Sequence, residues 1–237
     1  MNVKLKIGVV VFPGSNCDQD MVDALSRFPN TEVFKLWHKN TTLNDADLIV
    51  LPGGFSYGDY LRSGAIARFS PVMESVIQFA AQGGYVLGVC NGFQILCESG
   101  LLPGALLHND SHKFICENVF LRAVSKSAPI TAPLDSNEAL RIPIAHGEGR
   151  YYTDAVGLEA LKANDQILFR YCTASGDAAN PNGALEGIAG ICNSTKNVFG
   201  MMPHPERAAD AVLGNTDGNK ILGALIDHVR SSIAVVS

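Results

Sequence analysis

This sequence lacks the features that would assign a chain to a membrane or to nucleic acid. No apolar run approaches the roughly 18 residues that a membrane-spanning helix needs. The first apolar stretch of the chain, at residues 7–12, is short: it is interrupted by Gly8 and ended by Pro13. No basic cluster stands out in a chain of net charge -5, which argues against nucleic acid or an anionic membrane as the partner. We therefore expect a soluble protein without a secretory signal or a membrane anchor.

Two further absences concern cofactors and redox state. The chain has no Gly-x-x-x-x-Gly-Lys-Ser/Thr loop, so any ATP should be bound by another chain. Its six cysteines include no Cys-x-x-Cys pair and no compact disulfide framework, which predicts reduced thiols in a cytoplasmic protein. His108 and His112 share a loop-like stretch, but no cysteine or carboxylate pattern completes a ligand set. We therefore expect no metal site and no cofactor on this chain.

The composition is that of a globular protein, since 47% of the 237 residues are hydrophobic and 17% are charged. In the first hundred residues, strand-like apolar runs alternate with helix-like segments, the pattern of a parallel sheet with crossovers. The expected strands are residues 6–12, 32–37, 47–51 and 85–89. The expected helices are residues 18–28, one from the capping Ser70 to the glycines at 83–84, and one closed by Gly100.

Beyond residue 101 the apolar segments are shorter, and little helical signal separates most of them. They predict antiparallel additions to the sheet. The segments are 114–124, 140–145, 166–172, 187–191 and 198–202. Apolar residues at helical spacing predict a last helix at 219–233. We expect one α/β domain over residues 1–237, with an open, mostly parallel sheet and flanking helices.

The stretch Gly-Val-Cys-Asn-Gly at residues 88–92 ends an expected strand and begins an expected helix. A nucleophile at such a turn is lifted clear of the sheet, and glycines two residues to either side let strand and helix pass without a Cβ clash. The helix N-terminus favours a thiolate at Cys90. A cysteine in an apolar run is also often a buried structural residue, and the glycines alone leave both interpretations open.

A histidine and a glutamate stand two residues apart far downstream, at His204 and Glu206. Pro205 disfavours helix at His204, so we expect an extended segment in which side chains two apart share a face. Glu206 can then bind one imidazole nitrogen and turn the other towards a nucleophile, as in a catalytic triad. The alternative is a Pro-rich surface loop with a solvated histidine.

Function in an open α/β sheet collects at the carboxyl ends of the strands. Both Cys90 and the Pro-Gly-Gly turn at residues 52–54 fall at such ends. The backbone N–H groups of Gly54 and Asn91 could form a two-donor oxyanion hole beside the nucleophile. An ordinary glycine turn is the alternative.

The pattern Gly-x-Cys-x-Gly-x-Gln at residues 88–94, with His-x-Glu near the C-terminus, resembles the class I (triad) glutamine amidotransferases. One branch is similar over nearly the whole chain: the glutaminase subunits of phosphoribosylformylglycinamidine synthases. The matching blocks are residues 13–18, 53–62, 89–94, 144–149, 182–190 and 200–207. The resemblance implies a flavodoxin-like architecture.

The resemblance also implies an activity: hydrolysis of glutamine to glutamate and ammonia, with Cys90, His204 and Glu206 as the triad. Gln94, four residues after the cysteine, and His146 would bind glutamine. The ammonia would pass to a large, ATP-dependent synthetase subunit that holds ATP and Mg²⁺, assisted by a small accessory subunit. That partner would convert formylglycinamide ribonucleotide to formylglycinamidine ribonucleotide in purine biosynthesis.

Two other functions stay open at this point. A triad glutaminase of another biosynthetic pathway would share the triad but not the Phe-Ser-Tyr-Gly-Asp loop at residues 55–59. A peptidase-like or non-catalytic protein with a cysteine elbow would not need both His204 and Glu206. Two departures from the family pattern, Glu117 in place of a basic residue and a longer segment at 173–182, concern partner docking rather than the triad.

Overall fold

The computed structural model describes residues 4–236, and nine of the strands in this part of the chain form one mixed sheet of order β2-β1-β3-β4-β11-β10-β9-β6-β7. Neighbouring strands from β2 to β11 run parallel, and those from β11 to β7 run antiparallel. The parallel strands are β1 (Leu5–Val11), β2 (Thr31–Trp37), β3 (Leu48–Leu51), β4 (Tyr85–Val89) and β11 (Val198–Met201). The others are β6 (Ile115–Ala123), β7 (Leu140–His146), β9 (Ile167–Cys172) and β10 (Ile188–Cys192).

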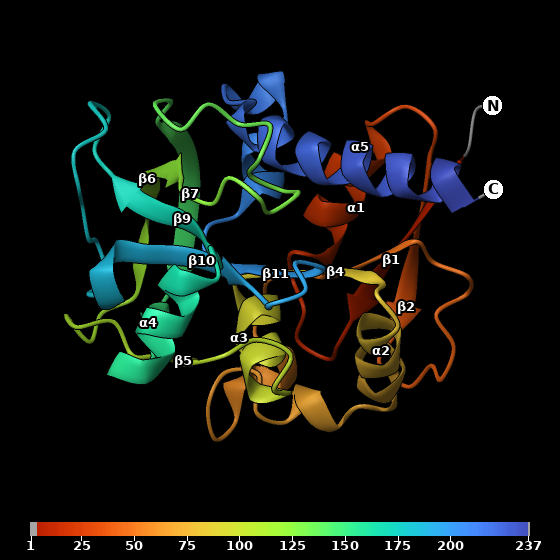
Figure 1. The fold of residues 1–237 in the computed structure, drawn as a ribbon. Helices are drawn as coiled ribbons and strands as arrows, with labels where there is room; N and C mark the ends of the chain where they lie inside the picture. Colours follow the sequence, from red (N-terminus) through yellow and green to blue (C-terminus); the bar gives the residue numbers. More distant parts are fainter. Residues whose placement is uncertain (1–3, 237) are drawn as a thin grey trace.

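Helices cover both faces of the sheet. Figure 1 shows α1 and α5 on one face of the parallel half and α2 and α3 on the other. The helices are α1 (Asp18–Ser26), α2 (Pro71–Ala81), α3 (Asn91–Glu98), α4 (Ala155–Ala163) and α5 (Asp217–Val236). Short 3-10 turns are η1 (Ser56–Asp59), η2 (Ala67–Phe69), η3 (Leu185–Gly187), η4 (Pro205–Ala208) and η5 (Ala211–Leu213). Because both faces are covered, every residue of β3, β10 and β11 is buried.

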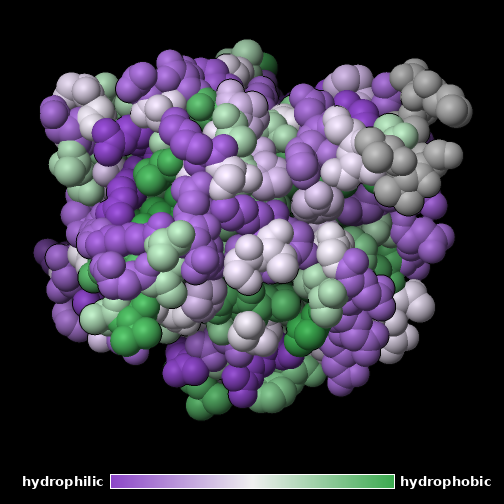
Figure 2. Space-filling model, in the orientation of Figure 1, coloured by the Kyte–Doolittle hydropathy of each residue, from purple (hydrophilic) through white to green (hydrophobic). Residues whose placement is uncertain are grey.

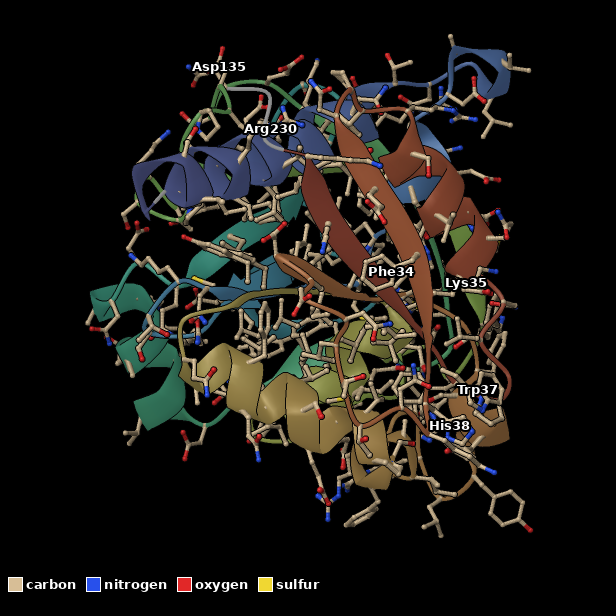
Figure 3. The ribbon with its side chains drawn as sticks, turned by 90° about the vertical axis from the view of Figure 1, so that its right-hand side faces the viewer. Phe34, Lys35, Trp37, His38, Asp135 and Arg230 are labelled. Carbon is tan, nitrogen blue, oxygen red and sulfur yellow. The ribbon has the colours of Figure 1, made fainter. Side chains whose placement is uncertain are left out.

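The sheet edge at β2 is exposed but carries charge. Figure 3 looks onto this side, with Lys35 and Trp37 labelled near β2. Lys35 is paired with Asp18 at 2.7 Å, and Glu32 with Lys4 at 3.1 Å. Charged side chains on an edge strand oppose the addition of a further strand. On the face in Figure 2, apolar residues form separate small groups among hydrophilic ones.

The sequence predictions of the main strands and helices are confirmed to within about two residues, the usual uncertainty of element ends, except that α5 runs three residues past its predicted end. Four of the five segments predicted as antiparallel strands after residue 101 are confirmed as such; the fifth, β11, is antiparallel to β10 but pairs parallel with β4. Three elements were not expected: helix α4 and the small sheet of β5 (Ala105–Leu107) and β8 (Arg150–Tyr152). Asp154 caps α4, accepting a hydrogen bond from the Gly157 N–H at 2.7 Å. A single domain over residues 1–237 stays a prediction, and residues 1–3 and 237 lie outside the described part.

The expected side-chain cap at Ser70 is wrong. Ser70 holds the position before α2, but its hydroxyl makes no bond to the helix. It pairs instead with the Tyr57 hydroxyl at 2.9 Å, which also bonds His38 at 2.7 Å. The serine thus joins the start of α2 to the 56–59 turn, because a hydroxyl that binds a distant partner is no longer available to the helix N-terminus.

No helix of the described residues has the length and apolar composition needed to cross a membrane. This holds for α5 as well, whose 20 residues make it the longest of the described helices.

Two glycines allow strand β4 and helix α3 to lie against each other. A Cβ on Gly88 would meet the Gly92 carbonyl carbon at 2.7 Å, and a Cβ on Gly92 would overlap the Leu51 carbonyl oxygen. Since Leu51 ends the neighbouring strand β3, Gly92 sets how closely the helix approaches the sheet. The glycine spacing expected for a strand-to-helix elbow is therefore present in three dimensions.

Gly92→Ala should destabilise the fold, by about 3 kcal/mol, because the added methyl group overlaps backbone that cannot move independently. The measurement is the urea midpoint of unfolding. Gly147→Ala is the matched control: the nearest atom to its Cβ would be Phe114 Cδ2 at 3.8 Å, an ordinary contact. The control should change stability by less than about 1 kcal/mol. A Gly92→Ala variant that unfolds at the wild-type midpoint would contradict the close packing of α3 on β3.

Candidate active site

Cys90 lies at the tip of the turn between β4 and α3. Its backbone has φ 51° and ψ -108°, outside the regions that non-glycine residues prefer. The Cys90 N–H donates to the Met201 carbonyl at 2.8 Å, which ties the turn to the end of β11. Strained backbone of this kind persists only where its surroundings enforce it, and it is typical of nucleophile elbows. The side chain is 5% exposed and faces a small cavity.

That cavity, the candidate catalytic pocket, has a volume of about 190 Å³. It gathers residues from the carboxyl ends of several strands, as expected for an open α/β sheet. Its wall includes Cys90, His204, Gly54, Cys17 and Arg207. The rings of Phe55 and Phe114, with centroids 6.4 Å apart, form an aromatic side of the same pocket.

His204 and Glu206 form a buried hydrogen-bonded pair. Their Nδ1 and Oε1 atoms are 2.6 Å apart, and the residues are 1% and 3% exposed. The His204 N–H donates to the Pro143 carbonyl of β7 at 2.9 Å, which fixes the backbone beside the pocket. With Nδ1 held by the carboxylate, Nε2 is the ring nitrogen left for proton transfer, and it has no hydrogen-bond partner.

The local backbone differs from the extended segment predicted from sequence. His204 is close to extended, with φ -101° and ψ 89°, but Pro205 begins the 3-10 turn η4, and Glu206 lies in its first turn. Proline suits the first position of a helix because its φ is already helical and it has no N–H to satisfy. The predicted contact between the two side chains is present although the predicted backbone is not.

The electrostatics of His204 favour an imidazolium. Burial alone would lower its pKa, but the adjacent Glu206 carboxylate and the Cys90 thiol more than offset this, so the pKa lies well above the usual value. A carboxylate in contact with a buried imidazole stabilises the charged ring. Such a ring can donate a proton to a leaving group in the pocket.

The two expected oxyanion donors lie beside Cys90. Gly54 lines the pocket with φ 140°, and a Cβ there would meet the Asn16 nitrogen at 2.7 Å, so only glycine fits. The Asn91 N–H is in the first turn of α3, where backbone donors have no partner within the helix. The Asn91 side chain, in contrast to its backbone N–H, binds the 56–59 turn: it accepts from the Ser56 N–H at 3.2 Å and donates to Asp59 at 3.2 Å.

Gln94 and His146, both expected to bind substrate, do not belong to the pocket wall that the structure shows. Gln94 donates to the Glu148 carbonyl at 2.6 Å and accepts from Asn91 at 2.9 Å. His146 is 3% exposed, and its Nδ1 lies 3.1 Å from Asn109 Oδ1. Burial first, and the charge of His204 second, lower the pKa of His146 to about 4. Both side chains therefore support the loops around the pocket.

The 56–63 segment is bound by the Asn91 side chain and carries a carboxylate with a raised pKa, that of Asp59. Burial raises the pKa of Asp59 to about 6, and the nearby Glu148 adds to this, while hydrogen bonds from Ser63 and Asn91 act in the opposite direction. Tyr57, Asp59 and Leu61 all have positive φ. The segment is thus strained and bound to the elbow through Asn91, a role that its sequence did not reveal.

Sequence reasoning missed Cys17 and Arg207 as pocket residues. The Arg207 guanidinium donates to Cys17 Sγ at 3.1 Å and to Asp20 at 3.2 Å. Only their positions in the sequence could have indicated a place in the pocket: Cys17 follows a buried parallel strand, and Arg207 directly follows Glu206. Neither signal assigns a contact between residues so distant in sequence.

Cys17, His204 and Glu206 are the metal-ligating residue types that lie close together in the described part of the chain, with ligand atoms within 4.8 Å of one another. Two contacts already engage them: Glu206 binds His204, and Cys17 accepts from Arg207. The guanidinium would also repel a cation at this distance. The rings of His108 and His112 lie 6.1 Å apart, outside this group. The trio therefore fits proton transfer better than metal binding.

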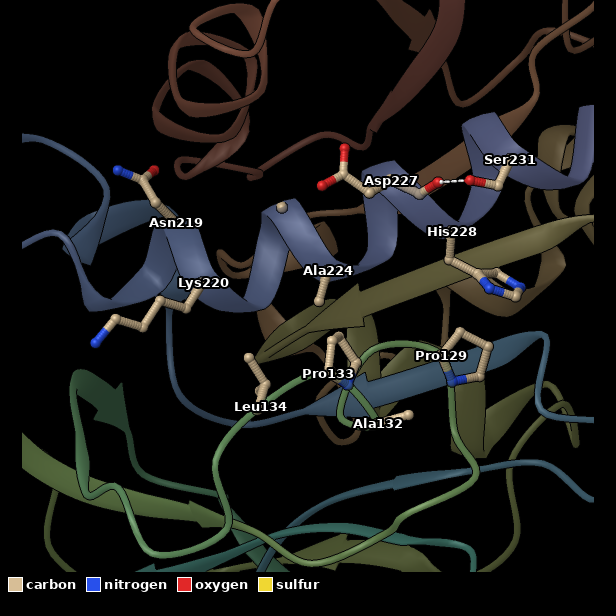
Figure 4. A pocket seen from close by; sticks show the side chains of 11 residues that line it. Pro129, Ala132, Pro133, Leu134, Asn219, Lys220, Ala224, Asp227, His228 and Ser231 are labelled. Atoms are coloured by element: carbon tan, nitrogen blue, oxygen red, sulfur yellow. Dashed lines mark hydrogen bonds between the residues drawn. The ribbon is translucent and has the colours of Figure 1, made fainter. Parts of the chain in front are cut away.

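A larger cavity, of about 780 Å³, lies between α5 and the loop containing Pro129 and Leu134 (Figure 4). None of the predicted site residues lines it. Helix α5 forms one side of this cavity, and within the helix the Ser231 hydroxyl donates to the Asp227 carbonyl at 2.8 Å. Size alone thus does not indicate the active site, and the clustering of reactive groups does.

Comparison with known proteins agrees with this geometry. Residues 4–223 match the family model of the CobB/CobQ-like glutamine amidotransferase domain. The chain is 54% identical to phosphoribosylformylglycinamidine synthase subunit PurQ of Moorella thermoacetica over 94% of its length and 96% of the relative's. It is 52% identical to the PurQ subunit of Salinibacter ruber, covering 94% of the chain and 97% of that subunit.

Solved structures agree as well. A chain in the structure of PurLQS from Thermotoga maritima is 42% identical, with a TM-score of 0.85, over 96% of this chain and all of that one. A glutamine amidotransferase from Thermotoga maritima, at 14% identity and a TM-score of 0.53, covers 97% of this chain and 85% of that chain and shares the fold. This chain therefore belongs to the glutamine amidotransferases, and within them to the PurQ subunits of phosphoribosylformylglycinamidine synthase.

Proposed function

We propose that this chain hydrolyses glutamine and supplies the ammonia to the synthetase subunit of phosphoribosylformylglycinamidine synthase, which makes formylglycinamidine ribonucleotide from formylglycinamide ribonucleotide. The observation that carries the proposal is the pocket that Cys90 and His204 both line, with the His204 ring hydrogen-bonded to the buried Glu206. Identity above 50% to PurQ subunits over almost the whole chain supports the choice of pathway.

Cys90 acts as the nucleophile. His204 takes the thiol proton at Nε2, and Sγ forms a bond to the carboxamide carbon while the carbonyl electrons move to oxygen. The N–H groups of Gly54 and Asn91 hold that oxyanion. When the intermediate collapses, His204 protonates the departing nitrogen, which leaves as ammonia, and a thioester remains on Cys90.

Hydrolysis of the thioester reverses the proton transfers. His204 takes a proton from water, the hydroxide attacks the thioester carbon, and the same two N–H groups hold the second oxyanion. Glutamate leaves and Sγ regains its proton. Glu206 keeps the ring oriented throughout and stabilises its charged form, since it holds Nδ1 at 2.6 Å.

The partners follow from the same chemistry. The name PurLQS of the related Thermotoga maritima structure suggests an assembly of several subunits. We propose that a large subunit holds ATP and Mg²⁺, that a small accessory subunit joins it, and that the complex is cytoplasmic. We also propose that residues 1–237 form one domain, since one sheet runs through the described residues. The test is glutamate release by the chain alone and with its partners, ATP and formylglycinamide ribonucleotide.

Cys90→Ala should lower glutamine-dependent synthesis by the complex at least about a thousandfold, because the nucleophile is lost. Synthesis from added ammonia should stay within about twofold of wild type, because that route bypasses the thioester. Cys116→Ala, which removes an exposed thiol on β6, is the control and should leave both rates unchanged. Loss of both routes in Cys90→Ala would assign the cysteine a structural role instead.

Glu206→Gln should reduce kcat for glutamine by about a hundredfold with little change in KM, because the pair acts on the transition state more than on binding. Glu206 raises the pKa of His204, so the imidazolium in the variant should lose its proton at lower pH. The alkaline limb of the kcat profile should therefore move to lower pH. Glu98→Gln, at a carboxylate paired with Arg62 outside the pocket, is the control. An unchanged rate in Glu206→Gln would remove this residue from the mechanism.

A further inference from the structure

Arg207 stands between the catalytic pocket and a second cavity. This outer cavity, of about 460 Å³, is lined by Asp20, Asp23, Arg27, Glu206, Arg207 and Leu213. Among the described residues that line either space, Arg207 alone belongs to both. Its side chain is therefore part of the wall that separates the reacting groups from the outer cavity.

The catalytic pair crosses the same wall. His204 faces the catalytic pocket, while Glu206 lines the outer cavity, and the 2.6 Å hydrogen bond joins the two sides. Arg207 comes directly after Glu206, and its N–H donates to the His204 carbonyl at 3.2 Å. An opening at Arg207 would thus lie next to the groups that release ammonia.

Two contacts at the start of α1 hold Arg207 in this wall. Its Nε donates to Asp20 on α1 at 3.2 Å, and one terminal nitrogen donates to Cys17 Sγ, just before α1, at 3.1 Å. The side chain is 34% exposed and borders both spaces. Two charge-assisted contacts fix a planar guanidinium better than one would.

The wall matters because the product of the reaction, ammonia, can escape through a small gap. Ammonia is about as small as water, so a side chain that leaves a gap would let it pass. In bulk water at neutral pH most of it becomes ammonium, which cannot attack an electrophile. The carboxylates of Asp20 and Asp23 in the outer cavity would attract that cation.

We propose that Arg207 is a positioning residue that seals the catalytic pocket against the outer cavity, so that ammonia released at Cys90 is retained for the synthetase. This inference rests on the proposed function, because only a chain that forms ammonia has ammonia to retain. It concerns coupling between the two reactions rather than the bond-breaking steps.

The test measures glutamate released and amidine formed in the same reaction by the full complex with glutamine, ATP and formylglycinamide ribonucleotide. In Arg207→Ala the ratio of amidine to glutamate should fall below about half of the wild-type ratio, because the pocket is no longer closed. The KM for glutamine should change by less than about threefold. Arg207→Met, which keeps the bulk of the side chain, should retain more of the coupling than Arg207→Ala.

Two matched variants sharpen the result. Arg27→Ala removes a guanidinium that lines the outer cavity only and pairs with Asp210, so it should stay coupled. Asp20→Ala releases Arg207 from α1 and should give partial uncoupling. Synthesis from added ammonia checks that each variant is folded and assembled.

Three outcomes would overturn the inference: a wild-type ratio in Arg207→Ala, equal uncoupling in Arg27→Ala, or a large rise in the KM for glutamine with coupling intact, which would assign Arg207 to substrate binding. Failure of the proposed function is a separate result. In that case the wild-type complex itself would release no glutamate from glutamine.

Discussion

The parallel pairing of β11 with β4 is the constraint on which the site depends. Val198 pairs with Val86 and Met201 with Val89, so both strands end at the same edge of the sheet. The chain leaves β4 through Cys90 and leaves β11 towards His204, which brings together two residues far apart in sequence. The bond from the Cys90 N–H to the Met201 carbonyl continues this pairing into the turn. A register shift would face every side chain of β11 the other way and separate the pair from the thiol.

Buried amides hold the loops that surround this edge. Asn91 binds Ser56 and Asp59, and Asn109 donates to the carbonyls of Lys113 and His146. Asn182 donates to the Gly149 carbonyl at 2.9 Å. A loop that is buried must satisfy its backbone groups somewhere, and an amide side chain can serve a donor and an acceptor at once. The shape of the pocket is therefore fixed by polar contacts as much as by apolar packing.

Much of this arrangement could be predicted from sequence, for reasons that differ between elements. Buried strands such as β3 and β4 are read from continuous apolar runs, and the elbow is read from glycines that nothing else could replace. Helix α4 was missed because its apolar residues are spread around the helix rather than gathered on one face, and only Leu161 is buried. Contacts between distant segments, such as Arg207 with Cys17, leave no local pattern. The same limit applies to Gln94 and His146: the sequence predicts that they bind substrate, which stays a prediction, but it does not predict their contacts with Glu148 and Asn109.

The position of β11 also has a consequence for how the chain acquires its structure. This strand lies between β4 and β10 in the middle of the sheet, yet it is the last strand in sequence order among the described residues. Pairings between residues so far apart must overcome a large loop-closure entropy and form slowly. During synthesis, the first four strands can assemble while β4 still lacks its neighbour, leaving an apolar edge uncovered. The strand that brings His204 to Cys90 is thus also the strand that joins the two halves of the sheet, so the nascent chain cannot be active before β11 has been made.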